Sequence, residues 1–167
     1  ENTMIVDMVR NDLSRVCQPG TVVVPRWLVA EPYATLWHLE SEVHGDLQDG
    51  VTMGELLAAT LPPASVTGCP KVSAMRFIAT MERRRRGPYC GALGYALPSG
   101  SAQWSVGIRQ AVLQAGEAWL GVGAGIVADS QPQAEWAEVC LKARSGLQWL
   151  DQVANSSSAT RPEKDVK

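Results

Sequence analysis

The first residues of the chain place apolar side chains at helical spacing. Across residues 1–16 they recur every three or four positions, which predicts a helix that ends at the Gln-Pro-Gly sequence of residues 18–20. The pattern then changes. A β-branched run at 21–25 and an alternating run at 34–47 together predict an antiparallel pair of strands.

The middle of the chain carries signals for two further helices. Thr52 and Glu55 have the spacing of a capping box, which predicts a helix over 52–61 that ends at a Pro-Pro pair. A second helix is predicted to begin near Lys71, where an apolar pattern follows a proline. Between these helices, residues 65–71 are expected to form a loop rich in small hydroxyl residues.

Strands are predicted again in the last part of the chain. Residues 87–97 begin as a turn and become a strand, and two more strands are expected at 104–113 and 118–127, joined near Gly116. A helix is expected from about Pro132. We therefore predict an α+β fold of antiparallel strands flanked by helices over residues 1–150, with no second domain, followed by a disordered polar tail at 151–167.

Composition narrows the range of functions. The chain has 167 residues, of which 46% are hydrophobic and 19% are charged, with a formal net charge of -2. This balance is typical of soluble globular proteins and argues against nucleic-acid binding. The basic run at 83–86 is interpreted as a charged helix end. No apolar run is long enough for a membrane span, and the spread cysteines indicate reduced thiols and a cytoplasmic location.

Residues 121–144 are the first candidate for a functional site. On a helix, Glu135, Glu138 and Lys142 lie on one face. One interpretation is a solvated face with an ordinary Glu138–Lys142 pair, worth about 0.2–0.5 kcal/mol. The other is a site for a ligand with carboxylates and a divalent cation, because the alternating glycines of residues 121–125 allow close approach of the backbone.

Three other positions have both a structural and a functional interpretation. Ser65, Thr67 and Lys71 surround a predicted helix start and form either an anion site or an ordinary loop. His38 is either a hydrogen-bonded structural residue or a catalyst. Arg109, among apolar neighbours in a predicted strand, marks either a salt bridge or a carboxylate site.

Seven motifs resemble one known family in their order along the chain. They are ENTMIVDMVRNDL at 1–13, the strand with His38, SVTGCPK at 65–71, GPYCGALGY at 87–95, Ile108-Arg109, GAGIVADS at 123–130 and the pair Glu138–Lys142. Together they resemble the carboxyl-terminal part of the chorismate-utilising enzymes, which include aminodeoxychorismate, anthranilate, isochorismate and salicylate synthases. The resemblance covers residues 1–150 and implies that the upstream half of the catalytic domain lies outside this chain.

The resemblance also implies roles for individual residues. Magnesium would be bound by Glu1 and Glu138, with Glu135 in support. Catalytic roles would fall on His38, Thr67 and Lys142. The contacts to chorismate would be made by Ser65, Tyr89, Arg109, Lys142 and the backbone of Gly123, Ala124 and Gly125.

The implied function is Mg2+-dependent amination of chorismate to 4-amino-4-deoxychorismate in folate biosynthesis, with ammonia from a glutamine amidotransferase partner. SVTG and RRGPYCG favour this branch. The alternatives are anthranilate synthase component I, then isochorismate or salicylate synthases, and a non-catalytic remnant of the family. Cys69, Ser73 and Arg76 depart from the family pattern. Without the upstream half, this portion is expected to be inactive alone.

Overall fold

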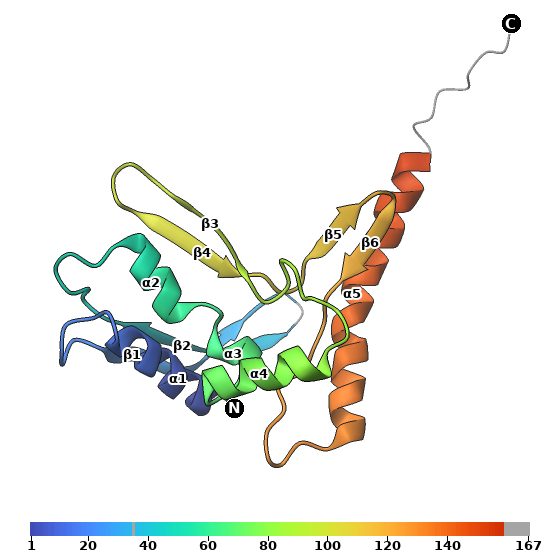
Figure 1. Cartoon of the computed structure of the whole chain (residues 1–167). Helices are drawn as coiled ribbons and strands as arrows, with labels where there is room; N and C mark the ends of the chain where they lie inside the picture. Colours follow the sequence, from blue (N-terminus) through green and yellow to red (C-terminus); the bar gives the residue numbers. More distant parts are fainter. Residues whose placement is uncertain (35, 159–167) are drawn as a thin grey trace, which may run out of the picture. The chain divides into compact units, whose positions relative to one another are not determined.

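The computed structural model describes residues 1–34 and 36–158, which form two compact units. The first unit is Glu1–Val106, and the second begins at Gly107. No change of composition in the sequence marks this division. Helices and antiparallel hairpins make up both units (Figure 1), so the predicted α+β class is confirmed.

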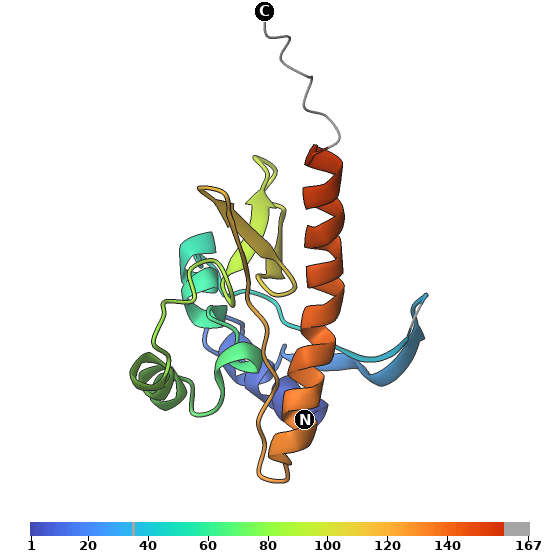
Figure 2. The same cartoon turned by 90° about the vertical axis from the view of Figure 1, so that its right-hand side faces the viewer.

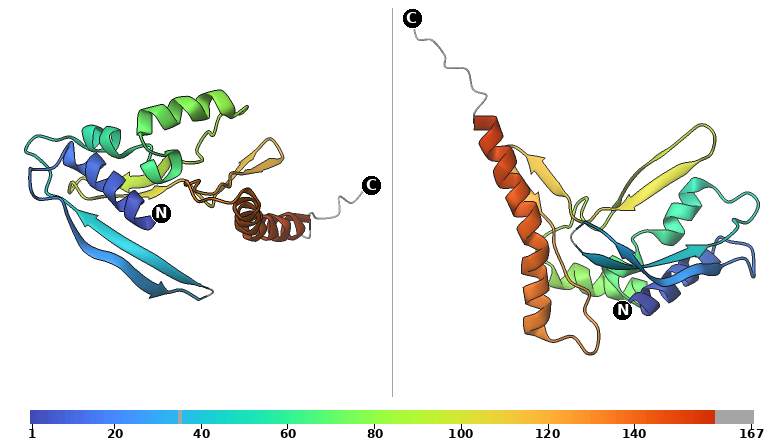
Figure 3. Two further views of the ribbon diagram at one scale, coloured as in Figure 1. Left: turned by 90° about the horizontal axis from the view of Figure 1, so that it is seen from below. Right: turned by 180° about the vertical axis from the view of Figure 1, so that it is seen from behind.

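Helix α1 (Asn2–Ser14) is the central element of the first unit. It contacts the strand pair β1–β2 on one side and helices α2 and α3 on another (Figure 3). It buries Val6, Met8 and the polar Asp12, while Met4 stays 43% exposed, so the buried positions do not form the single apolar stripe that the spacing predicted. The first unit is therefore assembled around the motif that opens the chain.

The predicted strand pair is confirmed as β1 (Val23–Pro32) and β2 (Trp37–His44), which form an antiparallel two-stranded sheet. The register of β1 shifts twice between Val23 and Val29, and Leu28 within this stretch has a positive φ of 52°. Such bulges increase the local twist of a ribbon. Beyond this irregularity the pairing is regular and places His38 opposite Glu31.

A small core joins the end of α1 to helix α2 (Met53–Thr60). Its buried members are Val16, Cys17 and Ala59, and Cys17 is only 1% exposed. The predicted capping box is confirmed: the Thr52 hydroxyl accepts from the Glu55 N–H at 3.2 Å, and the Glu55 carboxylate accepts from the Thr52 N–H at 2.8 Å. Two orphan donors of the helix end are thereby satisfied.

The rest of the first unit contains two helices and a hairpin. The segment expected to be a loop forms a short helix, α3 (Ala64–Thr67), which precedes the predicted helix α4 (Lys71–Met81). A turn then leads to strands β3 (Ala92–Ala96) and β4 (Ala102–Val106), which pair as an antiparallel hairpin (Figure 1).

The second unit has one hairpin and one long helix. Strands β5 (Ala111–Gln114) and β6 (Glu117–Leu120) pair through a turn at Gly116, and β6 packs against α5 (Pro132–Ser158), which is continuous in Figure 2. Within the described residues no helix has both the length and the apolar character needed to cross a bilayer.

Three sequence predictions about these last elements are corrected. The strand expected at 104–113 is interrupted at 107–110, and the strand expected at 118–127 ends at Leu120. The tail expected to be disordered from residue 151 instead continues α5 as far as Ser158. Residues 159–167, the rest of that predicted tail, lie outside the described residues.

Candidate active site

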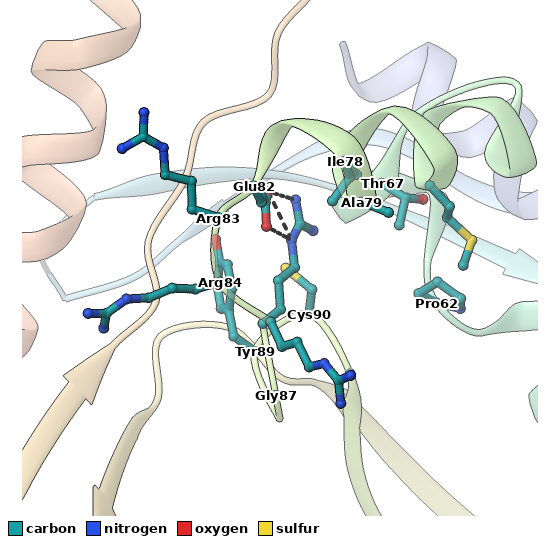
Figure 4. Close-up of a pocket in the computed structure, with 14 residues that line it drawn as sticks. Pro62, Thr67, Ile78, Ala79, Glu82, Arg83, Arg84, Gly87, Tyr89 and Cys90 are labelled. Carbon is teal, nitrogen blue, oxygen red and sulfur yellow. Dashed lines mark hydrogen bonds and ion pairs between the residues drawn. The ribbon is translucent and has the colours of Figure 1, made fainter.

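Two of the predicted site residues line one cavity of the first unit. This cavity has a volume of about 590 Å³, and both Thr67 and Tyr89 belong to its wall (Figure 4). The other lining residues are Pro62, Met75, Ile78, Ala79, Glu82, Arg83, Arg84, Arg85, Arg86, Gly87, Cys90 and Gly91. An apolar floor beside arginines suits a small ring that carries anionic groups.

Thr67 is positioned by the short helix α3. Its hydroxyl donates to the Pro63 carbonyl at 3.0 Å, which leaves the oxygen lone pairs available as acceptors. Ser65, on the same helix, is exposed and is not part of the cavity wall. Of the two hydroxyl residues expected near the substrate, the structure brings only Thr67 to the cavity.

Lys71 has a structural partner. Its ammonium donates to the Asp12 carboxylate at 2.6 Å and lies 3.4 Å from the Ala59 carbonyl, with both charged side chains largely buried. The ion pair ties the start of α4 to α1. The anion site considered for Lys71 is therefore not supported, because its charge is already neutralised.

The turn after α4 positions Tyr89. The Tyr89 phenol, like that of tyrosines in general, is protonated at neutral pH and can donate to an anionic ligand. Burial raises its pKa further. The guanidinium of Arg86 lies over the Tyr89 ring, 5.8 Å from its centroid. Arg86 also holds Glu82 and the Val66 carbonyl. The sequence interpretation of the basic run as a helix end missed this arrangement.

Glu1 lines a second cavity of the first unit. This cavity has a volume of about 860 Å³ and also contains Asp7, Asn11 and the Asp12–Lys71 pair in its wall. Glu1 occupies the N-cap position of α1, but its side chain makes no capping hydrogen bond. Glu1 is exposed beside a cavity that also carries the carboxylate of Asp7, while the carboxylate of Asp12 is neutralised by Lys71.

His38 lies on β2 and is exposed. Its ring contacts the Tyr33 ring, with centroids 5.1 Å apart and planes tilted by 51°. His38 belongs to the lining of neither cavity. The first unit by itself therefore does not bring His38 together with Thr67 and Tyr89.

In the second unit, Lys142 connects the glycine-rich segment to α5. Its ammonium forms an ion pair with Glu138 and donates to the Gly123 carbonyl at 3.3 Å. The solvated-face interpretation predicted the pair but not the contact with Gly123. Because residues 121–127 join no strand, the N–H groups of 123–125 make no backbone hydrogen bond within the described residues. They remain available to a ligand.

Two further side chains of this unit have features common at functional sites. Arg109 is exposed, at a bend with a φ of 54°, and not in the strand that was predicted. A left-handed conformation is uncommon for arginine, and such positions cluster at ligand sites. One carboxylate oxygen of Glu135, Oε2, is buried and has no hydrogen-bond partner among the described residues.

The predicted magnesium ligands are divided between the units. Glu1 lies in the first, and Glu135 and Glu138 lie in the second. Over residues 1–34 and 36–158, no group of three or more acidic, histidine or cysteine side chains is close enough to hold a metal. The donors nevertheless fit Mg2+, because carboxylate oxygens are its preferred protein ligands and the buried Oε2 of Glu135 lacks a partner.

Comparison with known proteins agrees with the order of the motifs. A family profile described as chorismate binding enzyme matches residues 1–148. The chain belongs to the chorismate-binding enzyme family. Within this family it is similar to anthranilate synthase component 1 of Aquifex aeolicus, with 41% identity over 90% of this chain and 31% of that protein.

Other members are equally similar. Aminodeoxychorismate synthase component 1 of Salmonella typhimurium is 43% identical over 90% of this chain and 33% of that protein. The crystal structure of anthranilate synthase component I from Streptococcus pneumoniae matches with a TM-score of 0.80 and 39% identity, covering 86% of this chain and 33% of that one. The chain thus spans about a third of the length of these family members.

Proposed function

We propose that the protein containing this chain catalyses the Mg2+-dependent amination of chorismate to 4-amino-4-deoxychorismate. Membership of the chorismate-binding family supports the substrate. The feature of the structure that carries the proposal is the glycine-rich segment, whose Gly123 is held by Lys142 while its N–H groups have no backbone partner. Such a row of donors suits a substrate carboxylate.

The two carboxylates of chorismate would be bound by different groups of this chain. Arg109 offers a planar fork that matches a carboxylate, and the protonated Tyr89 phenol offers a further donor. Thr67 lines the same cavity as Tyr89 and offers a hydroxyl to the ring substituents. His38 and Lys142 are the groups we assign to proton transfer, following the family resemblance.

Mg2+ would be held by Glu1 and Glu138, with Glu135 in support. When bound, the ion supplies positive charge for a substrate carboxylate and for the hydroxyl that leaves the ring. Glu138 has a second task in this chain, because it neutralises Lys142 and so helps to keep Gly123 in place.

We propose that the upstream part of the domain is needed for this activity, because it would complete the fold. The hairpin β1–β2 leaves Trp27 57% and Trp37 72% exposed, and side chains of this size are normally covered in a stable fold. We expect the longer protein to be cytoplasmic and to receive ammonia from a glutamine amidotransferase subunit or domain.

The choice of aminodeoxychorismate synthesis over anthranilate synthesis rests on SVTG and RRGPYCG, at residues 65–68 and 85–91. The similar identities of 43% and 41% to members of the two branches favour neither. Anthranilate synthase component I is therefore the second candidate.

Product analysis tests the proposal. The full-length protein is incubated with chorismate, ammonium and Mg2+, and the products are separated by chromatography. We expect 4-amino-4-deoxychorismate without release of pyruvate. Anthranilate with an equal amount of pyruvate would assign the protein to the second branch. Unchanged chorismate would refute both activities and leave the non-catalytic alternative.

A further inference from the structure

Arg86, the last arginine of the basic run at 83–86, contacts three residues: Glu82, Val66 and Tyr89. Its Nε lies 2.9 Å from Oε2 of Glu82, and one terminal nitrogen lies 2.6 Å from Oε1, so the fork is bidentate. The other terminal nitrogen donates to the Val66 carbonyl at 2.9 Å. One guanidinium thus connects the end of α4 to the short helix α3.

The same guanidinium packs on Tyr89. Its central carbon lies 5.8 Å from the centroid of the ring, within the distance at which a cation is attracted to an aromatic face. A planar guanidinium can stack on a ring while its edge donates hydrogen bonds, which an ammonium group cannot do. Arg86 therefore restrains the Tyr89 ring and the Val66 carbonyl at the same time.

These two contacts lie next to the two predicted site residues of the first cavity. Val66 immediately precedes Thr67, and Tyr89 is itself part of the wall. Figure 4 shows that Arg83 and Arg84 point away from Thr67. The Arg86 side chain is 24% exposed, which places the contacts in a partly desolvated setting where hydrogen bonds to charged groups are stronger.

We propose that Arg86 is a positioning residue for the chorismate site: held by Glu82, it fixes Tyr89 and the Val66–Thr67 segment of α3 in one cavity wall. This inference rests on the proposed function for the roles of Tyr89 and Thr67. We assign Arg86 no contact with the substrate, because its guanidinium nitrogens already donate to Glu82 and to the Val66 carbonyl. It determines how two substrate-contacting groups are placed relative to each other.

The test replaces Arg86 by lysine in the full-length protein. The ammonium keeps the charge but loses the fork and the stacking. We expect KM for chorismate to rise about tenfold with a smaller fall in kcat, since misplacement of binding groups by about 1 Å costs up to about a hundredfold. Glu82→Gln should also raise KM for chorismate, by a smaller factor. This second variant replaces Arg86→Lys in the test if Arg86→Lys does not fold.

Arg10→Lys is the matched control. Arg10 also pairs with a nearby carboxylate, that of Asp7 three positions before it on α1, but this pair is exposed and Arg10 itself lines neither cavity. We expect KM within about twofold of wild type for this variant, because exposed pairs contribute little. If Arg86 contributed only to overall stability, KM for chorismate would be unchanged in any Arg86→Lys protein that circular dichroism shows to be folded.

Hydrogen exchange separates failure of this inference from failure of the proposed function. If the wild-type protein does not consume chorismate, the proposed function fails, but the positioning role still predicts faster amide exchange at 64–68 and 87–91 in Arg86→Lys than in Arg10→Lys. Unchanged exchange in these segments would overturn the inference. So would an unchanged KM in a folded, active Arg86→Lys enzyme.

Discussion

Replacing Lys71 by methionine should destabilise the protein strongly, although the residue lies at a helix start that resembles an anion site. In the structure the Lys71 ammonium lies 2.6 Å from the Asp12 carboxylate, and the two side chains are only 18% and 11% exposed. Methionine keeps the length of the side chain but removes its charge. The substitution therefore leaves Asp12 buried without a counter-ion.

The size of the effect follows from this burial. Removing one partner of a buried ion pair costs about 3–5 kcal/mol. The small exposure that remains at both side chains lets water reach the pair, so we expect a loss at or just below the bottom of that range, about 2–3 kcal/mol. In a domain of this size such a loss lowers Tm by roughly 5–10 °C.

A double-mutant cycle measures the pair itself. Urea unfolding is followed by circular dichroism for wild type, Lys71→Met, Asp12→Leu and the double variant. We expect the double variant to recover most of the loss, because two apolar side chains need no counter-ion. If Lys71→Met left the unfolding midpoint unchanged but weakened binding of chorismate or phosphate, Lys71 would be a ligand residue and our assignment would be wrong.

Three further predictions concern other parts of the chain. Gly94→Ala should destabilise by several kcal/mol in urea unfolding, because a Cβ there would overlap a carbonyl and an indole of strand β4. Gly54→Ala in helix α2 should instead stabilise by about 0.5–1 kcal/mol, because a Cβ there would meet only the Thr52 hydroxyl at an ordinary contact distance of 3.8 Å. Equal effects of the two substitutions would contradict both expectations. Arg109→Lys should raise KM for chorismate, since an ammonium cannot replace the bidentate fork, and an unchanged KM would remove Arg109 from the site. Hydrogen bonds from Arg86 lower the pKa of Glu82 below 4.5, so their stabilisation is present above that pH and lost as the pH falls through the lowered pKa. The stability difference between wild type and Glu82→Gln should therefore shrink in acid, and a constant difference would exclude this pair as its source.

Features that depend on neighbouring residues were predictable from the sequence. The capping box of Thr52 and Glu55 and the pairing of the hairpins at 23–44 and 111–120 are set by local spacing and turn residues. The start of α5 at Pro132 was also predicted, because proline suits the first turn of a helix.

Features that depend on distant partners were not predictable. The partner of Lys71 is 59 positions away, and that of Arg86 at Val66 is 20 positions away. The strand expected to extend to residue 127 stops at Leu120, because the glycine-rich segment has no strand to pair with in the described residues. The extension of α5 beyond residue 150 lacks the apolar periodicity that marks most helices.

The predictions about site residues also divide into those that the structure groups together and those that it does not. Thr67 and Tyr89 meet in one cavity, and Lys142 reaches Gly123, so these groupings follow from the fold. Ser65 lies outside the cavity because it faces solvent on α3. The roles carried over from the family resemblance stay predictions for every one of these residues, and equally for His38, Arg109 and the three glutamates.

Titration of Mg2+ by calorimetry tests the central claim of the proposed function, that Glu138 is a metal ligand and not only the partner of Lys142. Wild-type full-length protein is compared with Glu138→Gln in the presence of chorismate, with the fold of both monitored by circular dichroism. We predict saturable Mg2+ binding in the wild type, and loss of both Mg2+ binding and chorismate consumption in a folded Glu138→Gln variant. Unchanged Mg2+ affinity in that variant would contradict the claim and leave Glu138 as a structural ion pair.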